Sequence, residues 1–128
     1  MLLLGALLGL KQEAFSQIKA QLLGRYSIGT YNSNGGVAEI SAYDPGSKRM
    51  FVINGPDTTL KIVNIANPAN PVLLNTISIK PYGIDLTSVA SNKKGIIAIA
   101  VIDSNGKTNP SSIVFLDVNG NFISKVKA

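Results

Sequence analysis

Apolar and polar positions alternate in short runs from residue 18 onward, and turn-forming residues separate the runs. The runs are rich in Ile, Val and Thr, whereas Gly, Pro, Asn and Asp gather between them. β-Branched side chains suit a pleated strand, and the other four residue types suit tight turns. The pattern therefore predicts an all-β sandwich, barrel or propeller. Nine strands are expected, at residues 18–26, 37–43, 49–54, 59–65, 72–79, 84–90, 95–102, 112–118 and 121–127.

The strands beyond residue 36 fall into two similar sets, at residues 37–80 and 84–127. Residues 60–65 align with residues 113–118 at a shift of 53 residues, and Ser41-Ala42 aligns with Val89-Ala90 at a shift of 48. These shifts are close to the length of one propeller blade. We therefore expect a partial β-propeller of about two four-stranded antiparallel blades.

Strand composition within each set supports the same architecture. The second and third strands are almost continuously apolar, as in IIAIAVI and SIVFLDV, which is typical of strands covered on both faces. The first strands carry small residues suited to a crowded propeller axis, and the fourth strands admit Asn, Thr and Lys. The run at residues 18–26 stands before the first complete set, and we expect it to be a closing strand that pairs with another blade of the ring.

The N-terminal ten residues, MLLLGALLGL, are apolar but far fewer than the roughly 20 that a membrane-spanning helix needs. They match the core of a signal peptide, and Ala14 and Ser16 supply small residues at the positions that signal peptidase reads for a cut after Ser16. A basic start is missing, which a miscalled start codon would explain. We expect residues 1–16 to be a signal peptide or its remnant, and a short amphipathic or buried helix is the alternative.

Three further stretches carry a family resemblance: LGRY at residues 23–26, AEISAYDPGSKRMFVIN at 38–54, and LKIVNIANPANPVLLNTISI at 60–79. With them the chain from Leu22 to Lys127 resembles the choice-of-anchor I family of secreted bacterial propeller proteins. The third stretch is also similar to LVIVD-type repeats. The resemblance implies an extracellular or cell-surface domain joined to varied C-terminal anchors. It also implies an N-terminal fragment, whose missing downstream blades would complete the fold.

Charge and composition exclude several functional classes. Twelve basic residues against seven acidic ones give a net charge of +5, but only Lys48-Arg49 and Lys93-Lys94 are adjacent. Such scattered charge keeps strand edges soluble more often than it binds phosphate, so we expect no nucleic-acid partner. His and Cys are absent, which removes the usual base of a serine hydrolase and the commonest transition-metal ligands.

The carboxylates remain as candidate chemistry, and each stands beside a turn or a strand end, where a structural role is ordinary. Beyond residue 16 they are Glu39, Asp44, Asp57, Asp85, Asp103 and Asp117. The loop that begins at Asp103 resembles the start of a calcium loop, but Thr108 and Val114 replace the Gly and Glu that such a loop requires. We therefore expect no catalytic, cofactor-binding or metal-binding residue in the chain.

Together these observations favour a non-catalytic, secreted or cell-surface module that presents propeller loops to an unidentified protein or ligand. One alternative is a fragment of an alkaline-phosphatase-like secreted phosphoesterase whose catalytic residues lie outside this chain. Another is a structural module that self-associates through unpaired blade faces.

Overall fold

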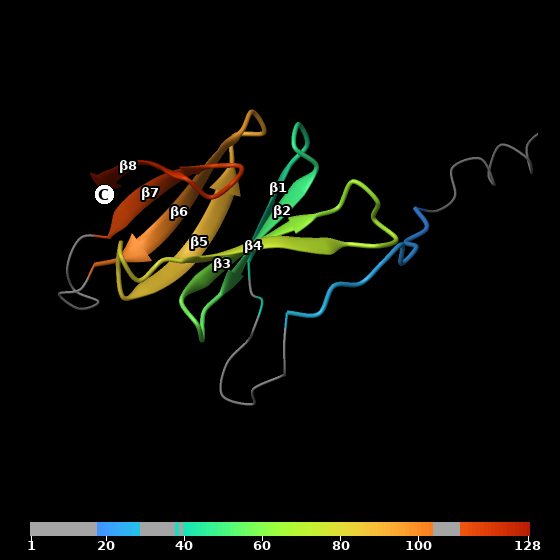
Figure 1. Ribbon diagram of the computed structural model, residues 1–128, viewed down its shortest axis with the longest axis horizontal. Helices are drawn as coiled ribbons and strands as arrows, with labels where there is room; N and C mark the ends of the chain where they lie inside the picture. Colours follow the sequence, from blue (N-terminus) through green and yellow to red (C-terminus); the bar gives the residue numbers. More distant parts are fainter. Residues whose placement is uncertain (1–17, 29–37, 39, 104–110) are drawn as a thin grey trace, which may run out of the picture.

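The computed structural model describes residues 18–28, 38, 40–103 and 111–128. These residues form eight strands in two four-stranded antiparallel sheets, each with its strands in chain order (Figure 1). They contain no helix. The all-β prediction is therefore confirmed, and the two sheets have the topology of propeller blades. The first sheet contains β1 (Ser41–Asp44), β2 (Arg49–Asn54), β3 (Thr59–Asn64) and β4 (Val72–Ser78), and the second contains β5 (Asp85–Ser91), β6 (Ile96–Ile102), β7 (Ser112–Asp117) and β8 (Phe122–Lys127).

Tight turns join β1 to β2 and β7 to β8, and they need the residue types that separate the apolar runs. In the β1–β2 turn, the backbone N–H of Ser47 donates to Asp44 Oδ2 at 2.9 Å, and Lys48 follows with a φ of 54°. In the β7–β8 turn, the backbone N–H of Asn119 donates to Asp117 Oδ1 at 2.8 Å, and Gly120 has a φ of 88°. Aspartate side chains thus hold both turns closed.

One core fills the space between the two sheets. Phe51, Ile53, Leu60 and Ile62 of the first sheet pack against residues of β5, β6 and β7, and all of these side chains are buried. Along β6 the buried positions are Ile97, Ile99 and Val101, every second residue. The alternation places one face of each sheet in the core and leaves the opposite face outside it.

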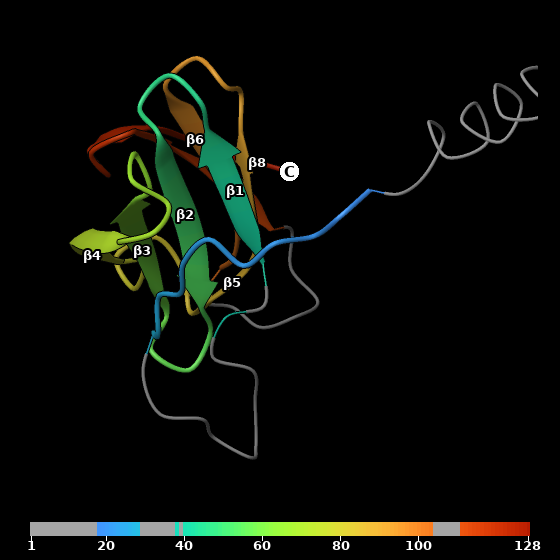
Figure 2. The ribbon, with the colours of Figure 1, turned by 90° about the vertical axis from the view of Figure 1, so that its right-hand side faces the viewer.

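The segment at residues 18–26 does not form the expected closing strand. Residues 18–28 adopt no regular structure, and no backbone hydrogen bond joins them to another described residue. They cross in front of β1 and β2 on the outer face of the first sheet (Figure 2). The strand expected at residues 18–26 is therefore not formed, because its apolar side chains cover a sheet face and its backbone does not pair at a sheet edge. Its pairing with another blade stays a prediction, because that blade is one of the expected downstream blades.

The expected start of the next strand was also too early. It was placed at residue 37, but β1 begins at Ser41. Ile40 lies just outside the strand, although its carbonyl oxygen still accepts a hydrogen bond from the backbone N–H of Ile53 at 3.1 Å. Residues 37 and 39 lie outside the described residues. The remaining strands agree with the prediction to within a residue or two at each end.

Candidate functional site

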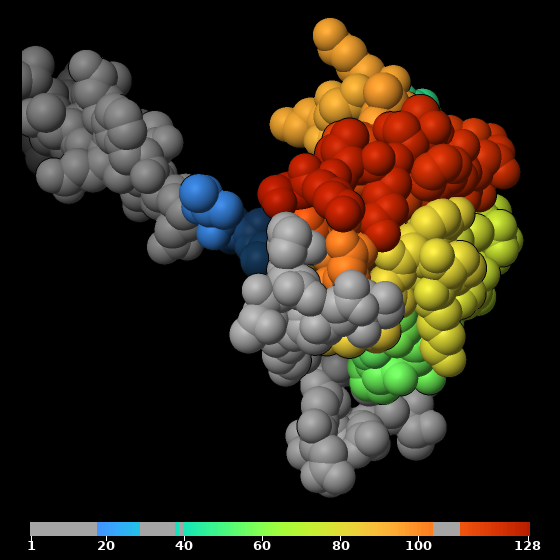
Figure 3. Space-filling model, turned by 90° about the vertical axis from the view of Figure 1, so that its left-hand side faces the viewer, coloured from blue at the N-terminus to red at the C-terminus, as the bar shows by residue number. Residues whose placement is uncertain are grey.

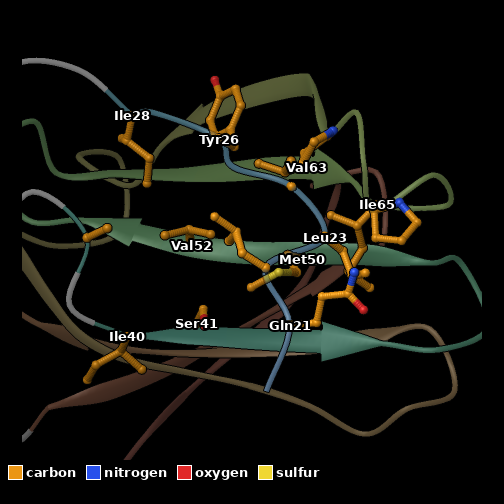
Figure 4. A pocket seen from close by; sticks show the side chains of 15 residues that line it. Gln21, Leu23, Tyr26, Ile28, Ile40, Ser41, Met50, Val52, Val63 and Ile65 are labelled. Atoms are coloured by element: carbon orange, nitrogen blue, oxygen red, sulfur yellow. The ribbon is translucent and has the colours of Figure 1, made fainter. Parts of the chain in front are cut away.

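An apolar cavity of about 530 Å³ lies between residues 21–28 and the outer face of the first sheet (Figure 4). Met50 and Val52 of β2 and Val63 of β3 form its floor, and Tyr26 and Ile28 lie over them. Gln21, Tyr26 and Ser41 bring the polar side-chain atoms, and none of the described residues that line the cavity is charged. The arrangement suits an apolar surface or ligand.

The covering segment approaches the β3–β4 loop closely at one point. A Cβ atom added to Gly24 would overlap the carbonyl oxygen of Pro68, so the segment lies directly against the β3–β4 loop at this point. That loop is itself ordered by Asn67, whose Oδ1 accepts from the backbone N–H of Ala69 at 3.1 Å. Two prolines, Pro68 and Pro71, also line the cavity. Their restricted φ angles stiffen this connection.

Asp44 is the most deeply buried of the described carboxylates, with 1% of its surface exposed. Its Oδ2 accepts hydrogen bonds from the N–H and hydroxyl of Ser47, and its Oδ1 accepts from the Ser91 hydroxyl at 3.2 Å and the Gly95 N–H at 3.0 Å. The Ser47 N–H is the main group that lowers the pKa of Asp44, against the opposing effect of burial. Asp44 therefore joins the β1–β2 turn to the β5–β6 hairpin.

Asp103 binds the outer strand of the second sheet. Lys125 Nζ donates to its Oδ1 at 2.7 Å, and the Ser112 hydroxyl donates to its Oδ2 at 2.9 Å. The hydrogen bond from Lys125 is the main cause of its lowered pKa. Residues 104–110, which include most of the calcium-like loop, lie outside the described residues. Both carboxylate oxygens of Asp103 are thus already occupied by protein donors.

The other carboxylates also serve turns and strand ends. Burial opposes ionisation of Asp117, but hydrogen bonds from the side chain and backbone of Asn121 outweigh it and lower the pKa of Asp117. Asp57 accepts from Asn54 Nδ2 at 2.8 Å, and Asp85 accepts from the backbone N–H of Leu86. Nowhere in the described part of the chain do three Asp or Glu side chains gather into a candidate metal site.

Arg49 makes a contact that the sequence did not reveal. Its Nη1 donates to the carbonyl oxygen of Val118 at 2.7 Å and to Asn119 Oδ1 at 2.6 Å. The basic pair at Lys48-Arg49 was interpreted as a device that keeps a strand edge soluble. For Arg49 the interpretation was incomplete, because its side chain ties β2 to the β7–β8 turn of the other sheet.

The outer face of the second sheet is a second apolar surface, and the repeat explains its composition. Aligning residues 60–65 with 113–118 makes Ile113 the counterpart of Leu60 and Phe115 the counterpart of Ile62. Leu60 and Ile62 are 0% and 1% exposed in the core, whereas Ile113 and Phe115 are half-buried and face outward. Strand β8, next to them, is exposed along its whole length and lies on the side shown in Figure 3.

Comparisons with known proteins place both sheets in one family match. The family model described as the choice-of-anchor I domain matches residues 39–128. No curated protein and no solved structure shows significant similarity to the chain. The described residues include no helix of the length and apolarity that crossing a membrane would require.

Proposed function

Because the chain belongs to the choice-of-anchor I domain family, we propose that it is a non-catalytic module of a secreted or cell-surface protein. In this proposal it acts by packing its sheet faces and presenting its loops to a partner. The observation that carries the proposal is the family match across both sheets. Two apolar outer faces and the structural use of the described aspartates support it.

The module acts within a larger set of similar sheets. Units of a repeat protein bury their faces against neighbouring units, and two units leave two faces without a neighbour of the same kind. The half-buried positions Ile113 and Phe115 are what such a face requires.

Export is part of the proposal and has its own test. Residues 1–16, which lie outside the described residues, would act as the signal peptide. Expression in a bacterial host with the upstream basic residues restored should deliver the protein to the medium or cell surface, with a mature N-terminus at Gln17. N-terminal sequencing of the exported protein checks the cleavage site, and retention of the whole protein in the cytosol would contradict surface function.

Absence of catalysis is tested with the full chain and chromogenic phosphate and ester substrates. We expect no turnover with or without added divalent metal, because the chain contains neither His nor Cys. Metal-dependent turnover that persists through repurification, and that is lost on substitution of a residue in this chain, would overturn the proposal in favour of a phosphoesterase.

A further inference from the structure

The face of the first sheet that residues 18–28 cover corresponds, position by position, to the face of the second sheet that packs against the first sheet. Val63 is the counterpart of Leu116 in the repeat. Pairing extends the match, because Met50 pairs with Val63 and Ile97 pairs with Leu116. Ile97 and Leu116 are 0% exposed in the core between the sheets. The floor of the cavity is thus the side of the first sheet that corresponds to the core-facing side of the second sheet.

The outer face of the second sheet is the matching half of that interface. Phe115 and Ile113 correspond to Ile62 and Leu60, which the first sheet buries against the second. By the same register, Val126 pairs with Ile113 as Ile77 pairs with Leu60. Ile77 packs on the core, whereas Val126 is 49% exposed. One chain therefore carries both halves of a sheet-to-sheet interface on opposite outer faces.

Residues 18–28 cover the first of these faces only loosely. Leu22 and Leu23 remain 74% and 59% exposed, and the cavity of about 530 Å³ persists beneath the segment. No backbone hydrogen bond joins the segment to another described residue. At Gly24 the segment lies directly against the backbone of Pro68. A well-packed interior has few voids larger than a water molecule, so this cover fills the face less well than a sheet would.

We propose that the outer face of the first sheet is a docking surface for the outer face of the second sheet of another copy of this chain, and that residues 18–28 cover it until they are displaced. The proposal rests on the function proposed above and identifies the partner of the packing faces. Contacts of this kind are head-to-tail, because each copy uses a different face. They continue the interface already present between the two sheets of one chain.

A difference in side-chain volume between β2 and β6 explains why residues 18–28 can compete with a second copy for the outer face of the first sheet. Phe51 pairs with Ile62, and Ala98 pairs with Phe115, so Ala98 stands where the first sheet has Phe51. A docking second sheet therefore brings less apolar volume than the first sheet brings to the internal interface. The apparent affinity between copies is further reduced by the fraction of molecules in which the cover is closed.

The first experiment releases the cover and measures self-association by sedimentation velocity over a range of concentrations. Gly24→Val should tighten self-association by about tenfold or more, since it removes the competing closed state. Gly55→Val is the matched control, because no atom lies within 4 Å of a Cβ at Gly55 and its φ is not positive. Equal association of the two variants would overturn the proposal and would favour a cover that is fixed, or a face filled by a later blade of a longer chain.

The second experiment tests head-to-tail geometry in the Gly24→Val background. Met50→Glu blocks the face of the first sheet, and Phe115→Glu blocks that of the second. Each variant alone should be monomeric, and a mixture should give a discrete 1:1 complex, because each supplies the face that the other lacks. Dimerisation of either variant by itself, or no complex in the mixture, would contradict the proposal.

Folding of the charged variants is checked by circular dichroism, and Met50→Ser and Phe115→Ser replace any variant that fails to fold.

A further readout uses the absence of native cysteines. Met50→Cys and Phe115→Cys chains, each made in the Gly24→Val background, should be joined by a short thiol crosslinker when mixed and far less when either is alone. Neither experiment depends on where the protein is located, so failure here is distinct from failure of the surface function.

Discussion

Single residues, rather than whole strands, fix how the two sheets sit against each other. Asp44 ends β1, yet two of its four hydrogen bonds come from Ser91 and Gly95 in the other sheet. Arg49 begins β2 and binds the turn beyond Val118. Both residues are polar, and both lie at strand ends. Apolar packing thus provides the buried surface between the sheets, and these polar contacts set the orientation of one sheet relative to the other.

Removal of the Asp44 carboxylate should destabilise the protein clearly. Asp44→Ala leaves the N–H groups of Ser47 and Gly95 and two hydroxyl groups without their acceptor, and we expect a loss of about 2–3 kcal/mol in the free energy of unfolding. Urea denaturation measures it. Asp57→Ala is the control, since that exposed carboxylate accepts one side-chain hydrogen bond, from Asn54. Similar losses in both variants would contradict this role for Asp44.

Acid should weaken the same contact. Hydrogen bonds, led by that from the Ser47 N–H, place the pKa of folded Asp44 below the unfolded value of about 3.9. The contribution of ionised Asp44 to the free energy of unfolding is therefore complete above about pH 3.9, and it is lost as the pH falls through the lower folded pKa. Asp103 and Asp117 have lowered pKa values and act in the same direction. Urea midpoints measured from pH 6 to pH 2 should decline less steeply for Asp44→Asn than for the natural chain.

Two turn glycines separate backbone strain from packing. Gly120 and Gly95 have φ angles of 88° and 96°, so alanine at either position costs about 1 kcal/mol of backbone strain. A Cβ at Gly120 would also lie 2.6 Å from Ile77 Cδ1, whereas a Cβ at Gly95 meets no atom within 4 Å. Gly120→Ala should therefore be the more destabilising by about 1 kcal/mol in thermal or urea unfolding. Equal effects would show that Ile77 moves aside freely.

At the scale of the element, β6 shows how one strand serves two surfaces. Ile99 is 0% exposed in the core, and Ile96 is 41% exposed. Ile99→Ala should lower the free energy of unfolding by about 2–4 kcal/mol, because it removes buried methyl groups and leaves a cavity. Ile96→Ala makes the same chemical change at an exposed position and should cost less than about 1 kcal/mol. Urea denaturation of both variants gives the comparison, and a reversed order would mean that the sheet is packed by its other face.

The central strands could be predicted from sequence because their signals are local. β2 spans the expected residues 49–54, and β7 ends one residue before the expected end, since apolar runs and turn residues bracket both. The segment at residues 18–26 could not be assigned in this way. Its apolar pattern indicates burial, but the same pattern fits a sheet edge and a sheet face. The contact that decides between them joins Gly24 to Pro68, far along the sequence.

The candidate site shares this dependence on distant contacts. The strands that carry Met50, Val52 and Val63 were expected to be covered on both faces. Val52 and Val63 are buried, and Met50 is half-buried. What covers their outer face was not predictable, because a repeat pattern assigns that position to another blade. In the structure, residues 21–28 lie there instead. Likewise, Arg49 carries no local sign that it reaches Val118.

At the scale of the whole molecule, a single core joins the two sheets, and this predicts how the chain unfolds. Buried side chains of β2, β3, β5, β6 and β7 form one cluster, so neither sheet keeps its buried face when the other unfolds. We expect one cooperative transition, with the amides of β2–β3 and β6–β7 exchanging hydrogen at the same global free energy.

The outer strands should exchange faster than this shared core. Side chains of β8 are exposed throughout and those of β4 nearly so, and such edges open locally at lower free energy. Native-state hydrogen exchange read by mass spectrometry distinguishes the elements, and Ile62→Ala and Leu116→Ala provide paired perturbations, one in each sheet. Because both side chains belong to one cluster, either substitution should lower protection in both sheets by the same free energy. Loss of protection confined to the substituted sheet would instead show two independent folding units joined by Asp44 and Arg49 alone.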